Sequence, residues 1–557
     1  MKKYIMLGIA VIICILLGVI FSFTQYQREV HREKVDEAVV VIGNEIIEDG
    51  ESILVEGENI YLPIEFIKKY FDPNINVSED GKRAYINLSH RDFEMEEDSL
   101  TKFIDGKDIE INIPLKREEH IHYLPLNQLG KIFSIDISYN EKSNRVIIDE
   151  FSGEERFGII KYDKVKVYSH RTLKIKTADI LNQGDRVKVL SEDGNLYRVR
   201  TDKGYFGYVE KKYTEEGLER IEYDSKINSI REEVEDKERI NITWEYVYEK
   251  NPDISKEEKI QGLDVISPTW FSLSQGGVVI NKGDFNYVKE AHEKGYKVWG
   301  LIDNSFNPEI TSEVLNSGEL KDKVIAQIAF YASLYNLDGI NIDFENIYYE
   351  DKDAFVAFVE DLTHILKKQN LIVSIDVTVP SNSERWSKVY DRERLGAIVD
   401  YVILMAYDEH WSTSPVSGSV ASIGWVERGI QASLNSIPRE KLILGIPFYT
   451  RVWKETKDEK GDVEVSSKAV PIKNVEQILD KYDAKVSWDE AVGQYFATYE
   501  YEDALYKIWI EDTRSIQLKL ELANKYNLKG IASWRKGYEY EEVWEVINTI
   551  VDEGDLL

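Results

Sequence analysis

The sequence predicts an α/β fold for its larger part, a (β/α)8 TIM barrel, and two observations support this prediction. Eight apolar segments follow one another after residue 238, and amphipathic helical stretches separate them. Continuous apolar strands that alternate with helices are typical of a parallel sheet covered by helices. Eight such units in about 300 residues match the size and strand number of a TIM barrel. The predicted strands are Ile240–Thr243, Leu263–Ser267, Val298–Ile302, Gly339–Phe344, Ile372–Val377, Tyr401–Met405, Leu442–Ile446 and Gly530–Ser533.

Length, charge and cysteine content exclude several classes of protein. At about 150 residues per domain, 557 residues indicate three or four units. The chain has 70 Lys and Arg against 101 Asp and Glu, a net charge of −31, which disfavours nucleic-acid binding. Cys14 is the single cysteine, so neither an intramolecular disulfide nor a cysteine-based zinc site can form. We expect no cofactor and no metal.

The N-terminus predicts a transmembrane helix over residues 4–23. This uncharged, mainly apolar run of about 20 residues is long enough to cross a bilayer. The alternative is a cleaved signal peptide, but the run is longer than a usual signal peptide core and ends in Phe21–Thr24 without a small-residue cleavage site. The short leader before the run favours export of the long part. We therefore expect a bacterial, membrane-anchored, extracytoplasmic protein that faces the cell wall.

Residues 39–150 contain an internal repeat. Tyr61–Ile64 returns as Tyr123–Leu126, and Arg83–Ile86 returns as Arg145–Ile148. Each copy predicts a short helix after Leu-Pro and then two strands, so the domain is α+β. The repeat resembles the stalk domain shared with the N-terminus of copper amine oxidases, a resemblance that implies no copper here.

Residues 156–213 predict a small β-barrel. Short alternating segments, such as Val165–Tyr168 and Gly184–Leu190, are broken by turns rich in Gly and Asp. The pattern resembles bacterial SH3-like domains, which implies either binding to the cell wall or a spacer without a ligand. The charged stretch 215–238 predicts a helical linker.

The fourth predicted barrel strand carries three polar side chains on one face. Side chains alternate along a strand, so Asn341, Asp343 and Glu345 share one face and three apolar residues share the other. In a barrel the apolar set packs against the helices, and the polar set points inward toward the C-terminal end, where barrel enzymes place their chemistry. The segment therefore predicts a catalytic site.

Four motifs in order give a specific family resemblance over residues 238–557. Asp338–Glu345 resembles the DxxDxDxE signature of glycoside hydrolase family 18, the chitinase-like enzymes. Met405–Asp408, Gly445–Tyr449 and Trp534 resemble the motifs of its sixth, seventh and eighth strands. The whole arrangement is similar to bacterial wall- and spore-associated members that degrade peptidoglycan or its cortex form.

The resemblance implies substrate-assisted retaining catalysis, in which the acetamide group of the sugar attacks its own anomeric carbon. On that reading Glu345 protonates the leaving oxygen and then activates water. Asp343 orients the acetamide N–H, and Tyr407 hydrogen-bonds the acetamide oxygen. Asp338 braces the strand, and Trp534 forms the floor of the sugar site.

One position departs from the family pattern, and further residues are expected to support the site. Many chitinases carry an acid where this chain has Asn341; the amide should remain a hydrogen-bond partner for Asp343 and make that carboxyl ionise more easily. Asp408 is expected to support the same site. Trp270 and Trp488 are further candidates for stacking on sugar rings, although aromatic residues in barrels more often belong to the core.

Two functions remain open at this point. The first is a glycosidase that cleaves β-1,4 bonds next to N-acetylglucosamine. The second is a non-catalytic wall scaffold whose barrel only binds glycan. The acidic and tyrosine side chains of the signature favour the enzyme. Chitin and peptidoglycan remain open as substrates, as do endo and exo action, although the predicted anchor and SH3-like domain favour peptidoglycan.

Overall fold

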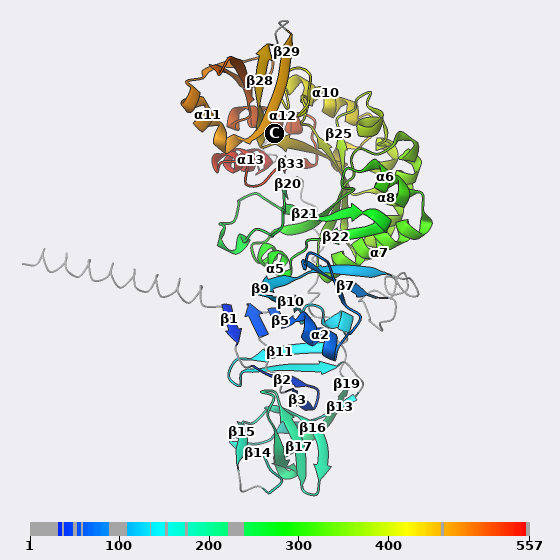
Figure 1. Cartoon of the computed structure of the whole chain (residues 1–557), viewed down its shortest axis with the longest axis vertical. Coiled ribbons are helices and arrows are strands. Elements are labelled where there is room, and N and C mark those ends of the chain that lie inside the picture. Colours follow the sequence, from blue (N-terminus) through cyan, green and yellow to red (C-terminus); the bar gives the residue numbers. More distant parts are fainter. Residues whose placement is uncertain are drawn as a thin grey trace, which may run out of the picture. The chain divides into compact units, whose positions relative to one another are not determined.

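The computed structural model describes residues 32–35, 38–47, 53–56, 59–88, 109–133, 135–150, 154–172, 176–220, 239–457 and 462–552 (Figure 1). The chain divides into two compact units, residues 1–96 with 113–227 and residues 97–112 with 228–557. The predicted transmembrane run, residues 4–23, lies outside the described residues. Among the helices of the described part, none has both the length and the apolar character needed to span a bilayer.

The second unit is built on a closed barrel of eight parallel strands, as the sequence predicts. Its strand order is β20-β33-β27-β26-β25-β24-β23-β21, and pairing of β20 with β21 closes the ring. All eight predicted strands are present, seven of them within two residues of their predicted bounds, whereas β21 continues seven residues beyond its predicted end at Ser267. They are β20 (Ile240–Glu245), β21 (Val265–Ser274), β23 (Lys297–Asp303), β24 (Gly339–Asp343), β25 (Ile372–Thr378), β26 (Tyr401–Met405), β27 (Leu442–Pro447) and β33 (Gly530–Trp534). The antiparallel strand β22 (Val278–Asn281) pairs with β21.

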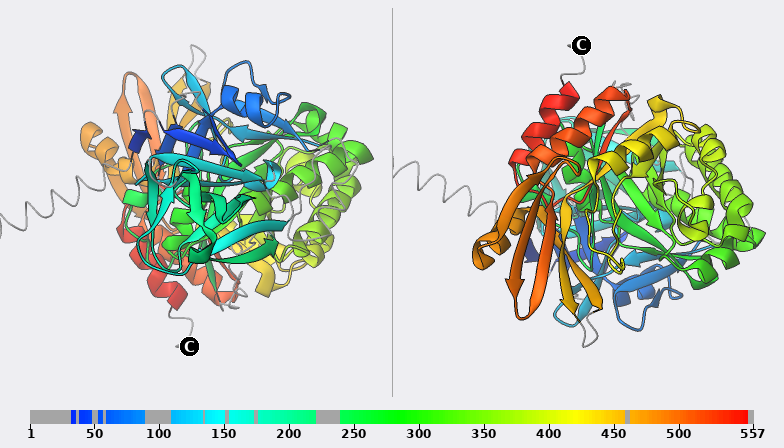
Figure 2. Two further views of the ribbon diagram at one scale, coloured as in Figure 1. Left: turned by 90° about the horizontal axis from the view of Figure 1, so that it is seen from below. Right: turned by 90° about the horizontal axis from the view of Figure 1, so that it is seen from above.

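Helices cover the outer side of the barrel (Figure 2). Phe344, which follows β24, stacks on Phe355 and Phe358 of α8 at ring distances of 5.8 and 5.5 Å. The apolar face of this strand therefore points outward, which leaves Asn341 and Asp343 on the inner face. The helices are α5 (Phe285–Glu293), α6 (Pro308–Leu315), α7 (Gly318–Leu334), α8 (Lys352–Lys367), α9 (Arg392–Ile398), α10 (Ile423–Ser433), α12 (Thr513–Lys525) and α13 (Glu542–Asp552).

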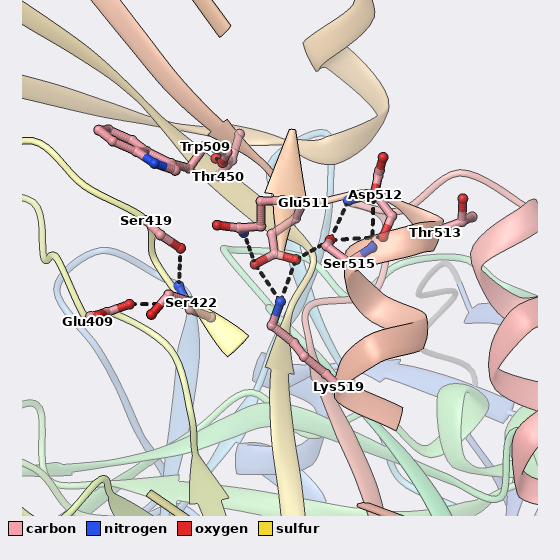
Figure 3. A network of polar contacts seen from close by, with 12 residues as sticks. Glu409, Ser419, Ser422, Thr450, Trp509, Glu511, Asp512, Thr513, Ser515 and Lys519 are labelled. Atoms are coloured by element: carbon pink, nitrogen blue, oxygen red, sulfur yellow. Dashed lines mark hydrogen bonds and ion pairs between the residues drawn. The ribbon is translucent and has the colours of Figure 1, made fainter. Parts of the chain in front are cut away.

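A second sheet is inserted between β27 and α12. Its antiparallel order is β29-β28-β32-β31-β30, and α11 (Val475–Tyr482) packs on one face. A buried ion pair joins this sheet to α12, because Lys519 Nζ lies 2.9 Å from Glu511 Oε2 (Figure 3). The strands are β28 (Tyr449–Lys457), β29 (Val463–Pro471), β30 (Lys485–Asp489), β31 (Gln494–Tyr501) and β32 (Ala504–Ile510).

A short segment far upstream in the sequence also belongs to the second unit. Residues 97–112 group with the barrel, and Ile111 and Asn112 are buried. The Asn112 side chain donates to the Val279 carbonyl at 2.7 Å and accepts from the Asn281 amide at 3.0 Å. Its backbone amide donates to the Tyr331 hydroxyl at 2.9 Å. The unit is therefore discontinuous along the chain.

The first unit contains the predicted repeat. Strands β5 (Asn59–Pro63) and β10 (Ile121–Pro125) pair antiparallel, so the two Leu-Pro motifs meet with Leu62 opposite Leu124. A helix follows each motif, α2 (Ile64–Tyr70) and α4 (Gly130–Phe133). Hairpins follow the helices, β6 (Asn76–Val77) with β7 (Arg83–Asn87) and β11 (Ile135–Asn140) with β12 (Arg145–Glu150). The remaining strands of the first unit are β1 (Arg32–Val35), β2 (Val39–Ile42), β3 (Glu45–Ile47), β4 (Ile53–Glu56) and β9 (Lys116–Glu118). Strand β8 (Glu110–Pro114) begins in the second unit and ends in the first.

The first unit also contains a seven-stranded antiparallel sheet, in the order β15-β14-β18-β17-β16-β13-β19. The helical linker predicted from residue 215 is wrong over its first part, because residues 214–220 form β19 and pair with β13. Pairing with a neighbouring strand overrides the helical propensity of the charged residues there. The strands are β13 (Glu154–Ile160), β14 (Val165–Tyr168), β15 (Thr177–Leu181), β16 (Arg186–Asp193), β17 (Leu196–Thr201), β18 (Phe206–Glu210) and β19 (Thr214–Arg220). The resemblance to SH3-like domains stays a prediction.

Candidate active site

Acidic side chains gather at the C-terminal ends of three neighbouring barrel strands. Asp303 ends β23 and is the register partner of Asp343, which ends β24. Asp376 lies near the end of β25, the next strand. Glu345 follows β24 by two residues. Because carboxyl ends of parallel strands meet at one end of a barrel, four acids contributed by three strands share one small site.

Asn341 links two of these strands below the acids. Its amide nitrogen donates to Asp376 Oδ1 at 2.8 Å and to Ser374 Oγ at 3.0 Å, and its oxygen accepts from Trp244 Nε1 at 2.9 Å. The side chain is fully buried. The expected partner was Asp343, whereas these three contacts direct the amide to the neighbouring strand β25. Asn341 therefore positions Asp376.

Asp343 lies in a setting that opposes its ionisation. Burial raises its pKa well above the usual range, and the negative charges of Glu345, Asp376 and Asp303 add to the effect. Its Oδ1 atom is buried and has no hydrogen-bond partner within the described part of the chain. Asp343 therefore resists ionisation even with an amide at position 341, and whether it ionises more easily than beside an acid stays a prediction. Asp376 places another carboxyl group nearby.

Asp376 has the same character. It is 1% exposed, and burial raises its pKa well above the usual range against the hydrogen bond from Asn341. Two neighbouring buried carboxyls whose pKa values are both raised disfavour the state in which both are ionised.

Hydrogen bonds to Asn304 hold the backbone of Glu345, and burial and neighbouring charges shift its pKa. The Asn304 side chain accepts from the Glu345 amide at 3.0 Å and donates to its carbonyl at 2.7 Å. Burial raises the pKa of Glu345 to about 7, and the charges of Asp408 and Asp303 contribute. A carboxyl with this pKa is a competent general acid near neutral pH.

Tyr407 and Asp408 follow β26 and close the site from another side. The Tyr407 ring lies 6.4 Å from Trp244 and 6.3 Å from Tyr449, edge-on to both. Burial raises the pKa of Tyr407, and the nearby Asp376 and Asp343 raise it further, so its hydroxyl remains a hydrogen-bond donor. Asp408 accepts from the Tyr449 hydroxyl at 2.6 Å and from Arg451 at 3.1 Å.

Asp338 lies just before β24, at the opposite end of the strand from the acids. It accepts from His292 Nε2 and from the Val298 amide, both at 2.8 Å. Burial is the largest single influence and would raise its pKa, but the hydrogen bond and charge of His292, the Val298 amide and the charge of Lys297 together outweigh burial, so the pKa is lowered. This side chain ties β24 to β23 and α5; its bracing role stays a prediction.

The three candidate tryptophans differ in their surroundings. Trp534 ends β33, is partly exposed, and its ring lies 5.8 Å from Trp244. Trp270 is 0% exposed and donates to Asn251 Oδ1 at 2.5 Å, so it is a core residue and its prediction as a sugar platform is wrong. Trp488 lies on the edge strand β30, where the Arg514 guanidinium lies 3.5 Å from its ring centre. A sugar role for Trp488 stays a prediction.

Several aromatic residues at the barrel mouth were not predicted. They follow strand ends in four different loops and are 38–66% exposed: Tyr246, Tyr248, Phe306, Trp386 and Trp411. For Tyr246, Tyr248 and Phe306 the available signal was their position within five residues of a predicted strand end; Trp386 and Trp411 lie farther along their loops. Within the described residues, no group of three or more His, Cys, Asp and Glu side chains could hold a metal ion.

Comparison with protein families finds two matches. Residues 235–539 match glycosyl hydrolases family 18, and residues 40–148 match the copper amine oxidase N-terminal domain. The first match covers more than half of the chain and contains all the acids described above.

Individual relatives agree with the larger match. The chain is 28% identical over 299 residues to an uncharacterized glycosylase of Bacillus subtilis (strain 168), covering 51% of this chain and 84% of the relative. It is 27% identical over 255 residues to the cortical fragment-lytic enzyme of the same organism, covering 45% of this chain and 58% of that protein. The structure of a chitinase from Chromobacterium violaceum ATCC 12472 aligns with a TM-score of 0.51 at 21% identity, covering 57% of this chain and 99% of the chitinase, and supports the fold.

Proposed function

Since the chain belongs to glycosyl hydrolase family 18, we propose that it cleaves β-1,4 bonds next to N-acetylglucosamine in peptidoglycan or chitin, with retention of configuration. The relatives include an enzyme whose name describes cortical fragment lysis and a structure named as a chitinase, and both names are compatible with these substrates.

The observation that carries the proposal is the pairing of Glu345 with Asp343. Burial raises the pKa of Glu345 to about 7, which keeps a proton available for a leaving oxygen. Asp343 lies on the same strand face, two residues away, so the two carboxyls cannot flank a sugar from opposite sides. Hydrolysis through a separate carboxylate nucleophile would require such an arrangement.

The proposed reaction uses the acetamide group of the substrate as the nucleophile. Glu345 transfers its proton to the glycosidic oxygen as the bond from that oxygen to the anomeric carbon breaks. The acetamide oxygen forms a bond to the same carbon and gives a cyclic oxazolinium ion. Glu345, now ionised, then removes a proton from water, and the water oxygen opens the ring to give the retained product.

Asp343, Asp376 and Tyr407 are proposed to hold the acetamide during these steps. Asp343 accepts a hydrogen bond from the acetamide N–H as positive charge develops on the ring. A proton shared with the neighbouring Asp376 can move away from Asp343 at that stage, because a nearby cation favours the ionised form. The Tyr407 hydroxyl donates to the acetamide oxygen and orients it toward the anomeric carbon.

Paired digestion of N-acetylated and de-N-acetylated glycan tests this mechanism, with NMR of the first anomer formed. We expect cleavage of the acetylated glycan alone, with a retained first product. A free amine has no carbonyl oxygen to attack the anomeric carbon. Equal cleavage of both glycans, or an inverted product, contradicts the mechanism. Binding of glycan without any release of reducing ends would instead support the non-catalytic wall scaffold.

The regions before the barrel are proposed to place the enzyme at its substrate. We propose that residues 156–213 form an SH3-like module that binds the cell wall. Residues 4–23 are proposed to hold the protein at the outer face of the membrane. Binding of the full chain and of a variant lacking residues 156–213 to purified wall tests the first of these roles.

A further inference from the structure

An arginine at the barrel mouth lies beside Trp534 and is surrounded by tyrosine rings. Its guanidinium carbon is 4.1 Å from the ring centre of Tyr538, 5.0 Å from that of Tyr246 and 5.8 Å from that of Tyr248. This residue, Arg535, directly follows Trp534 after strand β33. Tyr246 and Tyr248 follow strand β20, so two neighbouring strands build the cluster.

The cluster connects to the proposed catalytic site through ring contacts. Tyr246 lies 6.5 Å from Trp534, which in turn lies 5.8 Å from Trp244. Trp244 donates to Asn341 and faces Tyr407. A substituent on a glycan bound over Trp534 would therefore lie within reach of the arginine.

Arg535 differs from the neighbouring cations in its partners. Lys536 Nζ lies 2.9 Å from Glu245 and 2.7 Å from Glu257, and Arg451 is paired with Asp408. Arg535 makes no ion pair with any described residue of the chain. The one polar contact of its side chain there is a long one, 3.5 Å from Nη2 to the Tyr248 hydroxyl. An unpaired guanidinium is notable in a chain with a net charge of −31.

The geometry leaves this guanidinium available to an anion. Aromatic rings contact a guanidinium through its face, which fixes its orientation without using its N–H groups. The edge can then donate two parallel hydrogen bonds to a carboxylate. Tyr246 and Tyr248 are 38% and 66% exposed, so the cluster is open to solvent.

We propose that Arg535 binds a carboxylate on the glycan and so makes the site prefer peptidoglycan over uncharged chitin. The muramyl residues of peptidoglycan carry a lactyl carboxylate or a peptide joined to it, whereas chitin has no charged group. The proposal rests on the proposed glycosidase function and selects between its two substrates. A fixed cation also offsets the repulsion between an acidic protein and an acidic polymer.

The test measures kcat/KM of the full chain on peptide-free peptidoglycan strands and on the same strands after amidation of their carboxylates. The quantity of interest is the ratio of the two values. We expect Arg535→Gln to lower this ratio at least tenfold. The matched control Arg394→Gln removes the same charge from α9, where Arg394 pairs with Asp353 at the surface, and should leave the ratio within twofold. The same comparison of intact and amidated substrate is made on strands that keep their peptides. If Arg535→Gln lowers the ratio only for these strands, the contact is with a peptide carboxylate.

Equal losses on both substrates would overturn the proposal, because they would show that Arg535 only holds the loop in place. An equal ratio in the wild type and in Arg535→Gln would also overturn it. If Arg535→Gln does not fold, Arg535→Lys replaces it, since it keeps the charge but loses the planar fork and should lower the ratio partly. Should the wild type cleave neither strand, the glycosidase function fails. The carboxylate contact is then decided by calorimetric binding of intact and amidated strands to the same variants.

Discussion

Burial is the largest cause of the raised pKa of both acids at the end of β24, and the charges that add to it differ between the two. Asp343 is next to Asp376 and Asp303, so like charges surround it on the inner face of the barrel. Burial raises the pKa of Glu345 only to about 7. Asp343 is therefore suited to sharing a proton with Asp376. Glu345 is suited to delivering a proton to a substrate and recovering it.

Replacing Glu345 by Gln should abolish turnover while the fold and glycan binding are retained. The amide has the shape of the acid but can neither protonate the leaving oxygen nor activate water, so kcat should fall by about 10²–10⁴-fold or more. Release of reducing ends from peptidoglycan measures the loss, and glycan pull-down measures binding. Glu393→Gln, on the surface of α9, serves as the control. A variant with a tenth of wild-type activity would remove Glu345 from its assigned role.

The pH dependence of kcat/KM follows from the same residue. Because burial raises its pKa to about 7, Glu345 keeps its proton below that pH and loses it above, so activity should fall about tenfold per pH unit on the alkaline side. Asp408 is one of the charges that raise this pKa. Asp408→Asn should therefore move the alkaline limb to lower pH. If the alkaline limb of kcat/KM keeps its position in Asp408→Asn, a group other than Glu345 controls that limb.

The acids were predictable to different degrees from the sequence. Asp343 and Glu345 stand in one short motif, and their alternation with apolar residues is sufficient to place them on the inner face. Asp376 was missed because a single acid in the apolar segment Ile372–Val377 carries no local pattern; only the lateral pairing of β24 with β25 reveals it. Trp270 was misassigned because β21 continues to Ser274, beyond the predicted end at Ser267, so Trp270 lies within the strand and not after it.

At the scale of elements, the junction between the inserted sheet and α12 rests on a buried ion pair. Lys519 is 1% and Glu511 is 0% exposed, and Ser515 and Gln494 also donate to the Glu511 carboxylate at 2.6 Å each. Figure 3 shows Lys519 extending from the helix toward Glu511 at the end of β32. Because the Glu511 carboxylate is this deeply buried, its stability depends on the positive charge of Lys519.

Lys519→Met should destabilise the second unit by about 3–5 kcal/mol, because it leaves a buried charge without its partner. Lys525→Met on the same helix breaks an exposed pair with Glu427 and should change the stability little, because water screens this pair. Both changes keep a good helix former. Urea unfolding followed by tryptophan fluorescence reports on this unit alone, since all 11 tryptophans lie after residue 238. Equal losses for the two variants would contradict the importance of the buried pair.

Most of the helices and strands could be predicted from the sequence, but strand β19 could not. The eight barrel strands were predicted because each is a continuous apolar run between helical stretches. Strand β19 was not, because residues 215–220 are dominated by charged side chains that favour a helix in isolation. Its pairing with β13 joins segments more than 50 residues apart, which no local pattern reports.

At the scale of the whole molecule, the apolar run at residues 4–23 should hold the protein to membranes. Burial of about 20 apolar residues does not depend on charge screening, so the protein should remain in the membrane fraction after a wash at high salt. A variant without these residues should appear in the soluble fraction. A mature N-terminus near residue 25 would show cleavage and contradict retention.

The second unit, which contains the barrel, includes residues 97–112. These residues precede the last part of the first unit, residues 113–227, in the sequence. Ile109, Ile111 and Asn112 are buried and group with the barrel, whereas the chain continues from them to the repeat and to β13–β19 before it returns. A single protease cut introduced between residues 221 and 238 would sever the backbone but leave Asn112 bonded to Val279, Asn281 and Tyr331. The two pieces should therefore co-elute on gel filtration after cleavage, and Asn112→Ala should weaken their association. A nick that would release a domain held only by its linker should thus leave these two pieces associated.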